Sequence, residues 1–287
     1  MHMKNIAVIT GASSGMGKEF ALQVAQKYDY DEIWIVARRL DNLNSLAQEI
    51  NKTKNFQIVK PVKLDLGSRD GVKLLEDLLK SENEKLEKVE SGIQIGLLIN
   101  NAGFGTYGPF EETSIQAQMD MVELNCTSLT GICGIALPYL NKDSVIINTS
   151  SLAAFMPLGN FAVYAATKAY VLSFSTALAA ELKDKGIKVH ALCPGSVSTE
   201  FANVASNGAR KEVKGGIPPQ KVVAQCLKRA FKGKMTSLYR LKWKCLSFMS
   251  RFVSGKIVAR ITYKYNKRPR NPDESQQEKE INIDEFL

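Results

Sequence analysis

The strongest constraint on the fold of this 287-residue chain is a repeated alternation of short apolar runs with amphipathic stretches. The apolar runs cover residues 6–10, 33–37, 57–63, 95–100, 144–150 and 188–193, and the amphipathic stretches include 18–27, 40–53 and 71–89. Right-handed crossovers place helices on both faces of a parallel sheet. The pattern therefore predicts an α/β fold with a single Rossmann-type doubly wound sheet of about seven strands, which binds ligands at the carboxyl ends of its strands.

The composition is typical of a soluble globular protein, with 45% hydrophobic and 23% charged residues. There is no uninterrupted apolar run of about 18 residues, and the first residues lack the apolar region of a signal peptide, so a cytoplasmic location is expected. The five cysteines are scattered and lack a CxxC pair, which favours free thiols in a reducing compartment. His2 and His190 are the only histidines, so no metal site is expected and a Ser-His-Asp triad is nearly excluded.

A glycine-rich segment, residues 10–17, stands between the first expected strand and the first expected helix. Its glycines would let the backbone turn tightly and approach a pyrophosphate at the helix N-terminus, where free N–H groups and the helix dipole favour anions. The serines of the segment could instead only cap the helix. We interpret it as a nucleotide-binding turn. The candidate cofactor contacts are Gly11, Ser13, Ser14, Gly15, Met16 and Gly17.

The end of the second expected strand indicates which nucleotide binds. NAD-binding sheets usually carry an acidic residue here, whereas this chain has Arg38 and Arg39. Arg38 can stack on adenine and pair with a 2′-phosphate, which a carboxylate would repel. NADP(H) is therefore the predicted cofactor, although Arg39 could equally be a solvated charge that opens the next helix.

Tyr164, Lys168 and Ser151 form a candidate proton-transfer group. Tyr164 and Lys168 are four residues apart, a spacing that puts both side chains on one face of a helix. The Lys168 ammonium could then lower the pKa of the Tyr164 phenol toward the working range of a general acid or base. Ser151, thirteen residues before the tyrosine, could orient a reacting carbonyl, while Ser150 could be a structural hydroxyl.

Several further motifs follow one another along the chain. They are Asp65-Leu66, Asn100-Asn101-Ala102-Gly103, Asn125, Ser150-Ser151 and Pro194-Gly195-Ser196-Val197-Ser198-Thr199. With the glycine turn and the Tyr164 and Lys168 pair, they make the chain closely resemble the short-chain dehydrogenase/reductase family from about residue 5 to residue 199. The joint order and spacing of these motifs is highly specific, although each motif alone is weak.

The resemblance implies further contacts with the cofactor. The adenine would meet Asp65 and Leu66, its ribose the loop with Asn101, Ala102 and Gly103, and the nicotinamide end Pro194, Gly195, Val197 and Thr199, the last two holding the carboxamide. Tyr164 and Lys168 would also contact the cofactor, and Asn125 would support a water that relays protons to Lys168.

These residues predict an oxidoreductase that transfers hydride reversibly between NADP(H) and a ketone or secondary alcohol. An aromatic and apolar cluster is expected at the same end of the sheet, with a lid at about 196–219, and favours a hydrophobic substrate. The cluster comprises Phe104, Tyr107, Phe155, Met156, Leu158, Phe161 and Phe201. A hydroxysteroid or bile-acid ketone is the leading candidate, with a 3-oxoacyl chain as the alternative. A protein of another class, a non-catalytic NADP-sensing or membrane-associated binding protein, would keep the fold without turnover.

The C-terminal part departs from the family pattern. Residues 213–272 contain sixteen Lys or Arg and no Asp or Glu, and the net charge of the whole chain is +9, so the other residues together carry −7. Within this part, residues 241–262 predict one amphipathic basic helix with Leu246, Met249, Val253, Ile257 and Ile261 on one stripe. This helix could pack beside the substrate cleft, attach peripherally to an anionic membrane or attract an anionic substrate. No nucleic-acid partner is expected.

The expected domain organisation follows from these patterns. Residues 1–235 form the cofactor-binding and catalytic domain, 236–272 a basic amphipathic C-terminal extension near the substrate cleft, and 273–287 an acidic, mobile tail. By resemblance, two copies would pair as a homodimer through the helices at 113–137 and 164–182.

Overall fold

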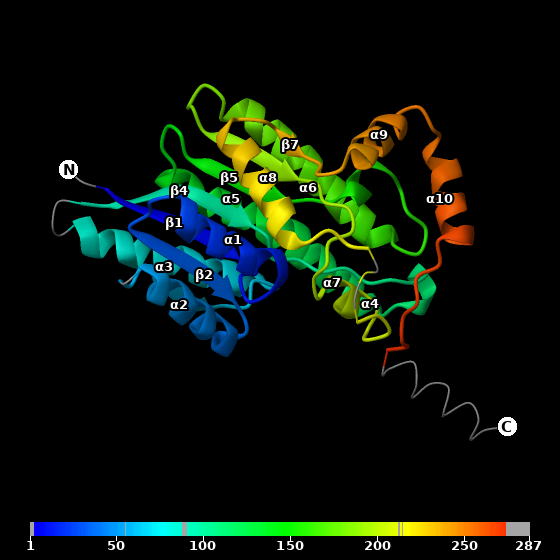
Figure 1. Cartoon of the computed structure of the whole chain (residues 1–287), viewed down its shortest axis with the longest axis horizontal. Helices are drawn as coiled ribbons and strands as arrows, with labels where there is room; N and C mark the ends of the chain where they lie inside the picture. Colours follow the sequence, from blue (N-terminus) through cyan, green and yellow to red (C-terminus); the bar gives the residue numbers. More distant parts are fainter. Residues whose placement is uncertain (1–2, 55, 88–90, 212, 214, 274–287) are drawn as a thin grey trace, which may run out of the picture.

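The computed structural model describes residues 3–54, 56–87, 91–211, 213 and 215–273 (Figure 1). The end of the helix predicted at 71–89 and all but the first residue of the predicted acidic tail lie outside this part. Seven parallel strands form one sheet in the order β3-β2-β1-β4-β5-β6-β7. The predicted fold class is thereby confirmed. The strands are β1 (Lys4–Thr10), β2 (Glu32–Ala37), β3 (Val59–Lys63), β4 (Ile93–Asn100), β5 (Val145–Thr149), β6 (Lys188–Leu192) and β7 (Thr236–Ser237).

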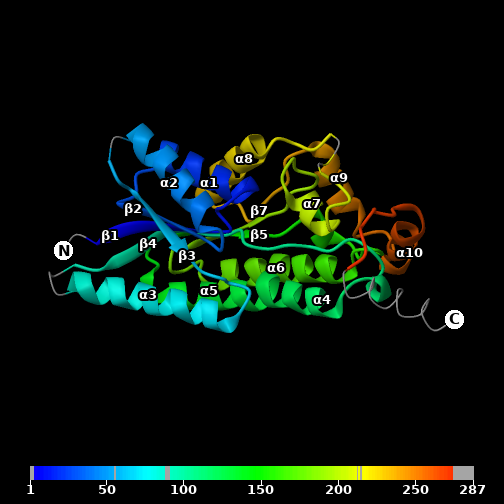
Figure 2. The same cartoon turned by 90° about the horizontal axis from the view of Figure 1, so that it is seen from below.

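Helices cover both faces of this sheet (Figure 2). The helices α1, α2 and α8 lie on one face, and α3, α4, α5 and α6 lie on the other. Their bounds are α1 (Gly15–Lys27), α2 (Leu40–Lys54), α3 (Arg69–Glu87), α4 (Ile115–Val122), α5 (Leu129–Ala136), α6 (Ala162–Glu181), α7 (Phe201–Ala205), α8 (Pro219–Phe231), α9 (Leu241–Met249) and α10 (Gly255–Tyr265). Short helical turns include η2 (Glu123–Ser128), a π-helical turn between α4 and α5, and η4 (Leu152–Phe155) after β5.

Successive residues of each central strand supply two separate cores. Ile9 packs in the cluster that contains Phe20 and Leu43 of the α1 and α2 layer. Val8 packs in the cluster that contains Leu75 and Val171 of the α3 and α6 layer. Strands that are buried on both faces read as continuous apolar runs, which is why they were visible in the sequence. The sheet is thus held rigidly, and its carboxyl edge is the platform for the loops of the site.

The single helix predicted over residues 241–262 is wrong, because the chain forms two helices, α9 and α10, separated at residues 250–254. Ser254 and Gly255 begin α10, and both residue types are better at a helix start than in a helix interior. Phe248 and Phe252 pack edge to face around the turn, with ring centroids 5.2 Å apart. The two helices therefore form an arch at one end of the molecule (Figure 1).

One helical stretch in the described part of the chain, Ile115–Tyr139, is long and apolar enough to cross a membrane by length and composition alone. In its most apolar window, 44% of the residues are buried within the fold. Asn125, in the π-helical turn of this stretch, is completely buried and hydrogen-bonded to neighbouring elements. A helix of a protein core passes the same length and hydropathy test, so the stretch is weak evidence for a membrane span.

Candidate active site

A cavity of about 1080 Å³ opens at the carboxyl ends of the strands. It extends from the glycine turn after β1 to the inner side of α9 and α10. All of the site residues predicted from the sequence line this cavity except Gly17 and Asn125. The structure therefore brings together segments that are separated by most of the length of the chain.

The glycine turn lies between β1 and α1. Gly11 and Gly15 have φ angles of +66° and +54°, in the left-handed region that glycine adopts without strain. A Cβ on Gly17 would overlap the carbonyl oxygen of Gly11, so Gly17 acts in the packing of the turn and not on its surface. Ser14 stands at the start of α1 without a side-chain capping bond. The first N–H groups of α1, which lack helical partners, therefore suit an anion such as a pyrophosphate.

Two arginines stand on the cavity at the end of β2. The Arg39 guanidinium lies 3.2 Å from Glu200 and 3.2 Å from the Ser13 hydroxyl, in an exposed ion pair and hydrogen bond. Within the described residues, the Arg38 guanidinium makes no hydrogen bond or ion pair. The free fork of Arg38 and the missing carboxylate at this strand end suit a nucleotide with a 2′-phosphate.

Two asparagines fix the loop after β4. The Asn101 side chain donates to the carbonyl oxygens of Thr10 and Gly11, at 3.2 and 3.3 Å, and so joins this loop to the glycine turn. Asn125 accepts from the Phe104 N–H at 3.1 Å and donates to the Phe104 carbonyl at 2.9 Å. It also donates to the Thr167 hydroxyl at 3.1 Å. Asn125 thus acts behind the cavity wall, and it ties the loop to α6.

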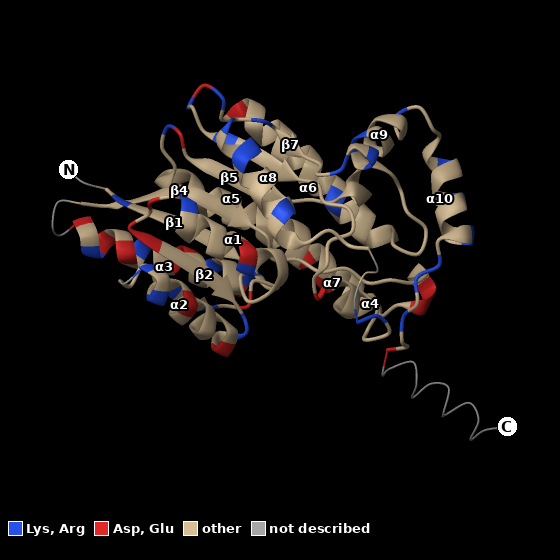
Figure 3. Cartoon of the chain, viewed as in Figure 1, with Lys and Arg blue, Asp and Glu red and all other residues tan. Residues whose placement is uncertain are grey.

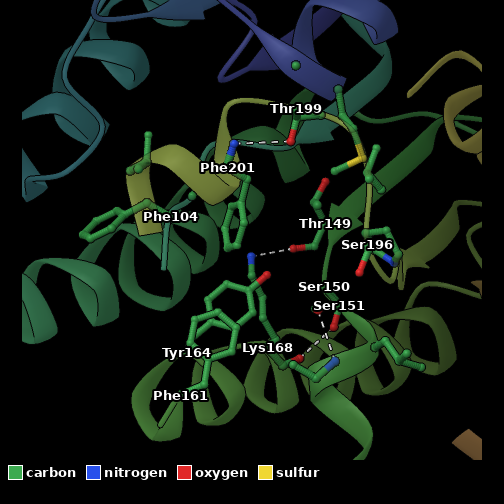
Figure 4. Close-up of a pocket in the computed structure, with 18 of the residues that line it drawn as sticks. Phe104, Thr149, Ser150, Ser151, Phe161, Tyr164, Lys168, Ser196, Thr199 and Phe201 are labelled. Atoms are coloured by element: carbon green, nitrogen blue, oxygen red, sulfur yellow. Dashed lines mark hydrogen bonds between the residues drawn. The ribbon is translucent and has the colours of Figure 1, made fainter. Parts of the chain in front are cut away.

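Ser151, Tyr164 and Lys168 meet at one end of the cavity (Figure 4). The Lys168 ammonium donates to the Thr149 carbonyl at 2.9 Å. The Ser151 oxygen accepts from the Ala153 N–H at 3.1 Å, which leaves its own proton free to donate. Ser150, by contrast, donates to the Lys168 carbonyl at 2.8 Å and so fastens α6 to the end of β5.

Burial dominates the electrostatics of this group. Desolvation raises the pKa of Tyr164 to about 12, while the Ser151 hydroxyl and the Arg268 guanidinium oppose this rise. Desolvation also lowers the pKa of Lys168 to about 8. The expectation of a lowered pKa for Tyr164 is therefore wrong for this arrangement of protein groups, because loss of solvent outweighs the opposing effects of Ser151 and Arg268. Near neutral pH, the Tyr164 phenol is therefore protonated.

The family model for short chain dehydrogenases matches residues 5–210. The chain belongs to the short-chain dehydrogenase family. The model ends before α8, so the arch of α9 and α10 lies outside the part of the chain that it covers.

Two relatives of the chain are named for different activities. Over 210 residues the chain is 33% identical to 17-beta-hydroxysteroid dehydrogenase type 3 of Mus musculus, covering 71% of this chain and 64% of the mouse protein. Over 202 residues it is 33% identical to the very-long-chain 3-oxoacyl-CoA reductase of Neurospora crassa, covering 69% and 58%. The chain thus spans less than two thirds of the length of these relatives.

A solved short-chain dehydrogenase from Sphingobium yanoikuyae in complex with NADPH superposes with a TM-score of 0.72 and 26% identity, covering 87% of this chain and 94% of that one. A nicotinamide cofactor is therefore supported for this family member, and the glycine turn fits its pyrophosphate.

Beyond the cofactor residues, the cavity has an apolar chamber. The family motifs predict only part of the lining of this chamber. Phe104, Tyr107, Met156, Leu158, Phe161 and Phe201 line it as predicted, whereas Phe155 packs against the core instead. The residues that sequence reasoning did not assign to the cavity come mainly from α9, α10 and the segments beside α7 and after α10. Among them are Val204, Arg210, Trp243, Leu246, Met249, Val253, Val258, Ile261 and Arg268. The apolar stripe predicted at residues 246–261 was a usable signal for the cavity wall that the arch supplies. Arg268 could not be told apart in the sequence from the other fifteen basic residues between 213 and 272.

Proposed function

We propose that this protein is an NADP(H)-dependent oxidoreductase that interconverts a hydrophobic ketone and its secondary alcohol, of the hydroxysteroid or bile-acid type. The observation that carries the proposal is the meeting of Ser151, Tyr164 and Lys168 with the glycine turn in one cavity. When bound, the nicotinamide supplies or accepts the hydride. Tyr164 donates its proton to the carbonyl oxygen, and Ser151 donates a hydrogen bond to the same oxygen as charge builds on it.

The chain's own residues would hold the cofactor. Lys168 would contact the nicotinamide ribose, and Asn125 positions the loop that would pass the adenine ribose. Val197 and Thr199 would hold the carboxamide, and Asp65 and Leu66 would meet the adenine. Arg38, with its unpaired guanidinium and no carboxylate beside it, supports NADP over NAD.

The lining of the cavity supports an apolar substrate. The volume of about 1080 Å³ includes the predicted nucleotide site as well as the apolar chamber. Leu246, Met249 and Val253 add apolar surface from the C-terminal arch. A 3-oxoacyl chain remains the alternative substrate, because the very-long-chain reductase of Neurospora crassa is about as similar as the mouse steroid dehydrogenase.

A substrate panel tests the proposal. Purified protein with NADPH is mixed with steroid ketones, bile-acid ketones and 3-oxoacyl thioesters, and loss of the reduced nicotinamide absorbance is followed. Turnover of a steroid or bile-acid ketone supports the leading candidate, and turnover of only the thioesters supports the alternative. NADPH binding without turnover anywhere in the panel would show a binding protein.

We also propose that the outer side of the arch contacts an anionic membrane surface. Leu241, Phe248, Phe252 and Tyr265 are each more than half exposed, and they do not line the cavity. Figure 3 shows Lys and Arg on α9, α10 and the segment that follows, with no acidic residue on either helix. Near-surface basic residues contribute roughly 1 kcal/mol each to such binding. Sedimentation with anionic vesicles that is lost in high salt would support the contact, and equal recovery with neutral vesicles would argue against it.

Homodimerisation through α4, α5 and α6 is the third part of the proposal. Ile115, Met119 and Val122 on α4 and Tyr170 on α6 are exposed apolar residues. An apolar patch on the surface often marks a protein–protein contact. Light scattering tests the pairing, and a Met119→Lys variant that remains the same size as the wild-type dimer would rule out this face.

A further inference from the structure

Arg268 belongs to the segment after α10, which turns back over the cavity and is fastened to the body of the protein. The Asn271 N–H donates to the Ser206 carbonyl at 3.0 Å, and the Asn271 side chain donates to the Asn207 carbonyl at 2.8 Å. Asp273 accepts from the Ser114 N–H at 2.8 Å. This double attachment holds the segment in one position, and the Arg268 side chain forms part of the cavity wall.

Two aromatic rings position the Arg268 guanidinium. Its Cζ lies 4.5 Å from the centroid of the Phe161 ring and 5.0 Å from that of Tyr107. Phe161 in turn stacks on Tyr164, with centroids 4.2 Å apart and planes inclined by 21°. The guanidinium and the proposed proton donor thus contact the same phenylalanine. A cation over an aromatic ring gains attraction from the ring while its N–H groups remain able to donate.

The charge at this end of the cavity is uncompensated. Arg210 lines the same cavity, and its charge together with burial lowers the pKa of Arg268. Across the described ranges, neither guanidinium makes a hydrogen bond or ion pair. The acidic residues that line the cavity are committed elsewhere, since Glu200 pairs with Arg39 and Asp65 accepts from the Gly67 N–H.

Burying a guanidinium group without a partner costs free energy. An anion that enters the cavity would offset this cost by forming charge-assisted hydrogen bonds with the group. We propose that Arg268, assisted by Arg210, forms an anion subsite in the substrate chamber, so that the preferred substrate is a hydrophobic ketone or alcohol that also carries a carboxylate, phosphate or similar anionic group. The proposal rests on the proposed function in that the carbonyl of the same molecule is placed at Tyr164 and Ser151. The planar guanidinium fork suits a carboxylate or phosphate better than a lysine ammonium does.

Matched pairs of compounds test the subsite. One pair is an oxo-steroid carboxylic acid and its methyl ester, and a second is a phosphorylated steroid ketone and the free alcohol. We expect the wild type to prefer the anionic member by about ten- to a hundredfold in kcat/KM, the gain from a hydrogen bond to a charged group. Arg268→Met should remove most of this preference through a higher KM for the anion, and kcat/KM for the neutral member should fall by a clearly smaller factor.

Three further variants separate this role from others. Arg268→Lys should retain part of the preference, and Arg210→Met should reduce it. Lys267→Met, on the neighbouring residue that does not line the cavity, should leave it unchanged. Equal losses for the anionic and neutral compounds, with a shifted pH profile, would mean that Arg268 only tunes the Tyr164 pKa and would overturn the subsite. A wild type that favours the neutral member would overturn it as well.

Equilibrium binding keeps the two proposals distinguishable. The acid and its ester are titrated into the protein with NADP⁺ present, and NADPH affinity and thermal unfolding confirm that each variant is folded. Selective binding of the acid that Arg268→Met abolishes, without turnover of any compound, would keep the subsite and remove the enzymatic function. Turnover with no difference between acid and ester, in binding or in rate, would keep the function and remove the subsite.

Discussion

The Lys168 ammonium lies 5.6 Å from the centroid of the Tyr164 ring and is held there by the Thr149 carbonyl, 2.9 Å away. Burial raises the pKa of the phenol to about 12 and lowers that of the ammonium to about 8. Both shifts favour the neutral form of the group concerned. A tyrosine that is protonated near neutral pH is suited to donate a proton.

The first prediction is that Tyr164→Phe removes turnover while NADPH binding persists. The substitution deletes the proton donor but keeps the ring that stacks on Phe161, and loss of a general acid costs about 10² to 10⁴ in rate. Steady-state kinetics and an NADPH fluorescence titration measure the two effects. Tyr170→Phe is the matched control, since this exposed tyrosine on the same helix only hydrogen-bonds to Thr130. Near-normal turnover in Tyr164→Phe would contradict the proposed chemistry.

The second prediction is that Arg38→Asp shifts the cofactor preference toward NADH. A carboxylate at this strand end repels a 2′-phosphate and can hydrogen-bond a ribose hydroxyl. We expect kcat/KM for NADPH to fall at least about tenfold, the effect of losing one charge-assisted hydrogen bond. Arg39→Met, measured in parallel, should have a smaller effect because Arg39 is already paired with Glu200. An unchanged NADPH to NADH ratio in Arg38→Asp would exclude Arg38 from recognition of the 2′-phosphate.

The central part of the fold could be predicted because its signals are local. A parallel strand buried on both faces is a continuous apolar run, so the strands β1, β2, β4, β5 and β6 were visible as such runs. β3 (Val59–Lys63) is an edge strand that is only partly buried, and its run is interrupted by lysines. β7 pairs through only two residues, Thr236 and Ser237, just beyond the predicted domain boundary at 235, and no run that short carries a pattern. The break between α9 and α10 was missed because apolar residues at 246, 249, 253, 257 and 261 keep helical spacing across it.

The same difference between local and long-range signals decides which parts of the site could be predicted. The residues expected on its cofactor side could be predicted to line the cavity because each falls within a short motif next to a strand end. The chamber side could be predicted only in part, since Arg268 and Trp243 reach the cavity only through the folding of the arch back onto the body. The pKa of Tyr164 was misjudged for a related reason. Spacing shows that Lys168 is near, but burial, which sets the sign, depends on Tyr107, Phe161 and Phe201 packing around the ring.

The third prediction concerns the glycine turn. Gly17→Ala places a methyl group against the carbonyl oxygen of Gly11, a backbone atom that cannot yield without distorting the turn. We expect a loss of stability of about 1 to 3 kcal/mol and weaker NADPH binding, measured by denaturant unfolding and fluorescence titration. Gly134→Ala is the control, because no atom lies within 4 Å of the added group, and it should stabilise helix α5 by about 0.5 to 1 kcal/mol. Tight NADPH binding by Gly17→Ala would show that the turn is not the pyrophosphate site.

The fourth prediction is a loss of stability in mild acid caused by His190. Burial lowers the pKa of this histidine from 6.5 to about 4, and its ring is hydrogen-bonded to the Lys234 carbonyl and the Ser237 hydroxyl. Because the unfolded chain takes up the proton first, stability is full above pH 6.5 and is lost as pH falls toward 4. The free energy of unfolding should decrease by up to about 1.4 kcal/mol per pH unit in this window. Denaturant titrations at several pH values should show a flatter profile in His190→Gln, and an equally steep profile there would assign the effect to other groups.

The last prediction concerns the attachment of α10 to the cavity. Gly159 donates its N–H to the Thr262 hydroxyl at 2.9 Å, and a Cβ at Gly159 would overlap Tyr263. The Asn160 side chain donates to the carbonyl of Thr262 at 3.3 Å and to that of Tyr263 at 2.9 Å. Gly159→Ala should therefore push α10 outward, so that KM for an apolar ketone rises several-fold and NADPH affinity, which depends on the opposite end of the cavity, stays the same.

Hydrogen exchange over residues 255–265 measures this displacement directly, and faster exchange is expected in Gly159→Ala. Thr262→Val is a second, milder variant that removes the hydroxyl acceptor and keeps the shape of the side chain. Its effects should have the same direction and a smaller size, because the two Asn160 bonds go to main-chain oxygens that the substitution keeps. If exchange accelerates in either variant while KM for every apolar ketone is unchanged, α10 is a cover for the domain and not a wall of the substrate chamber.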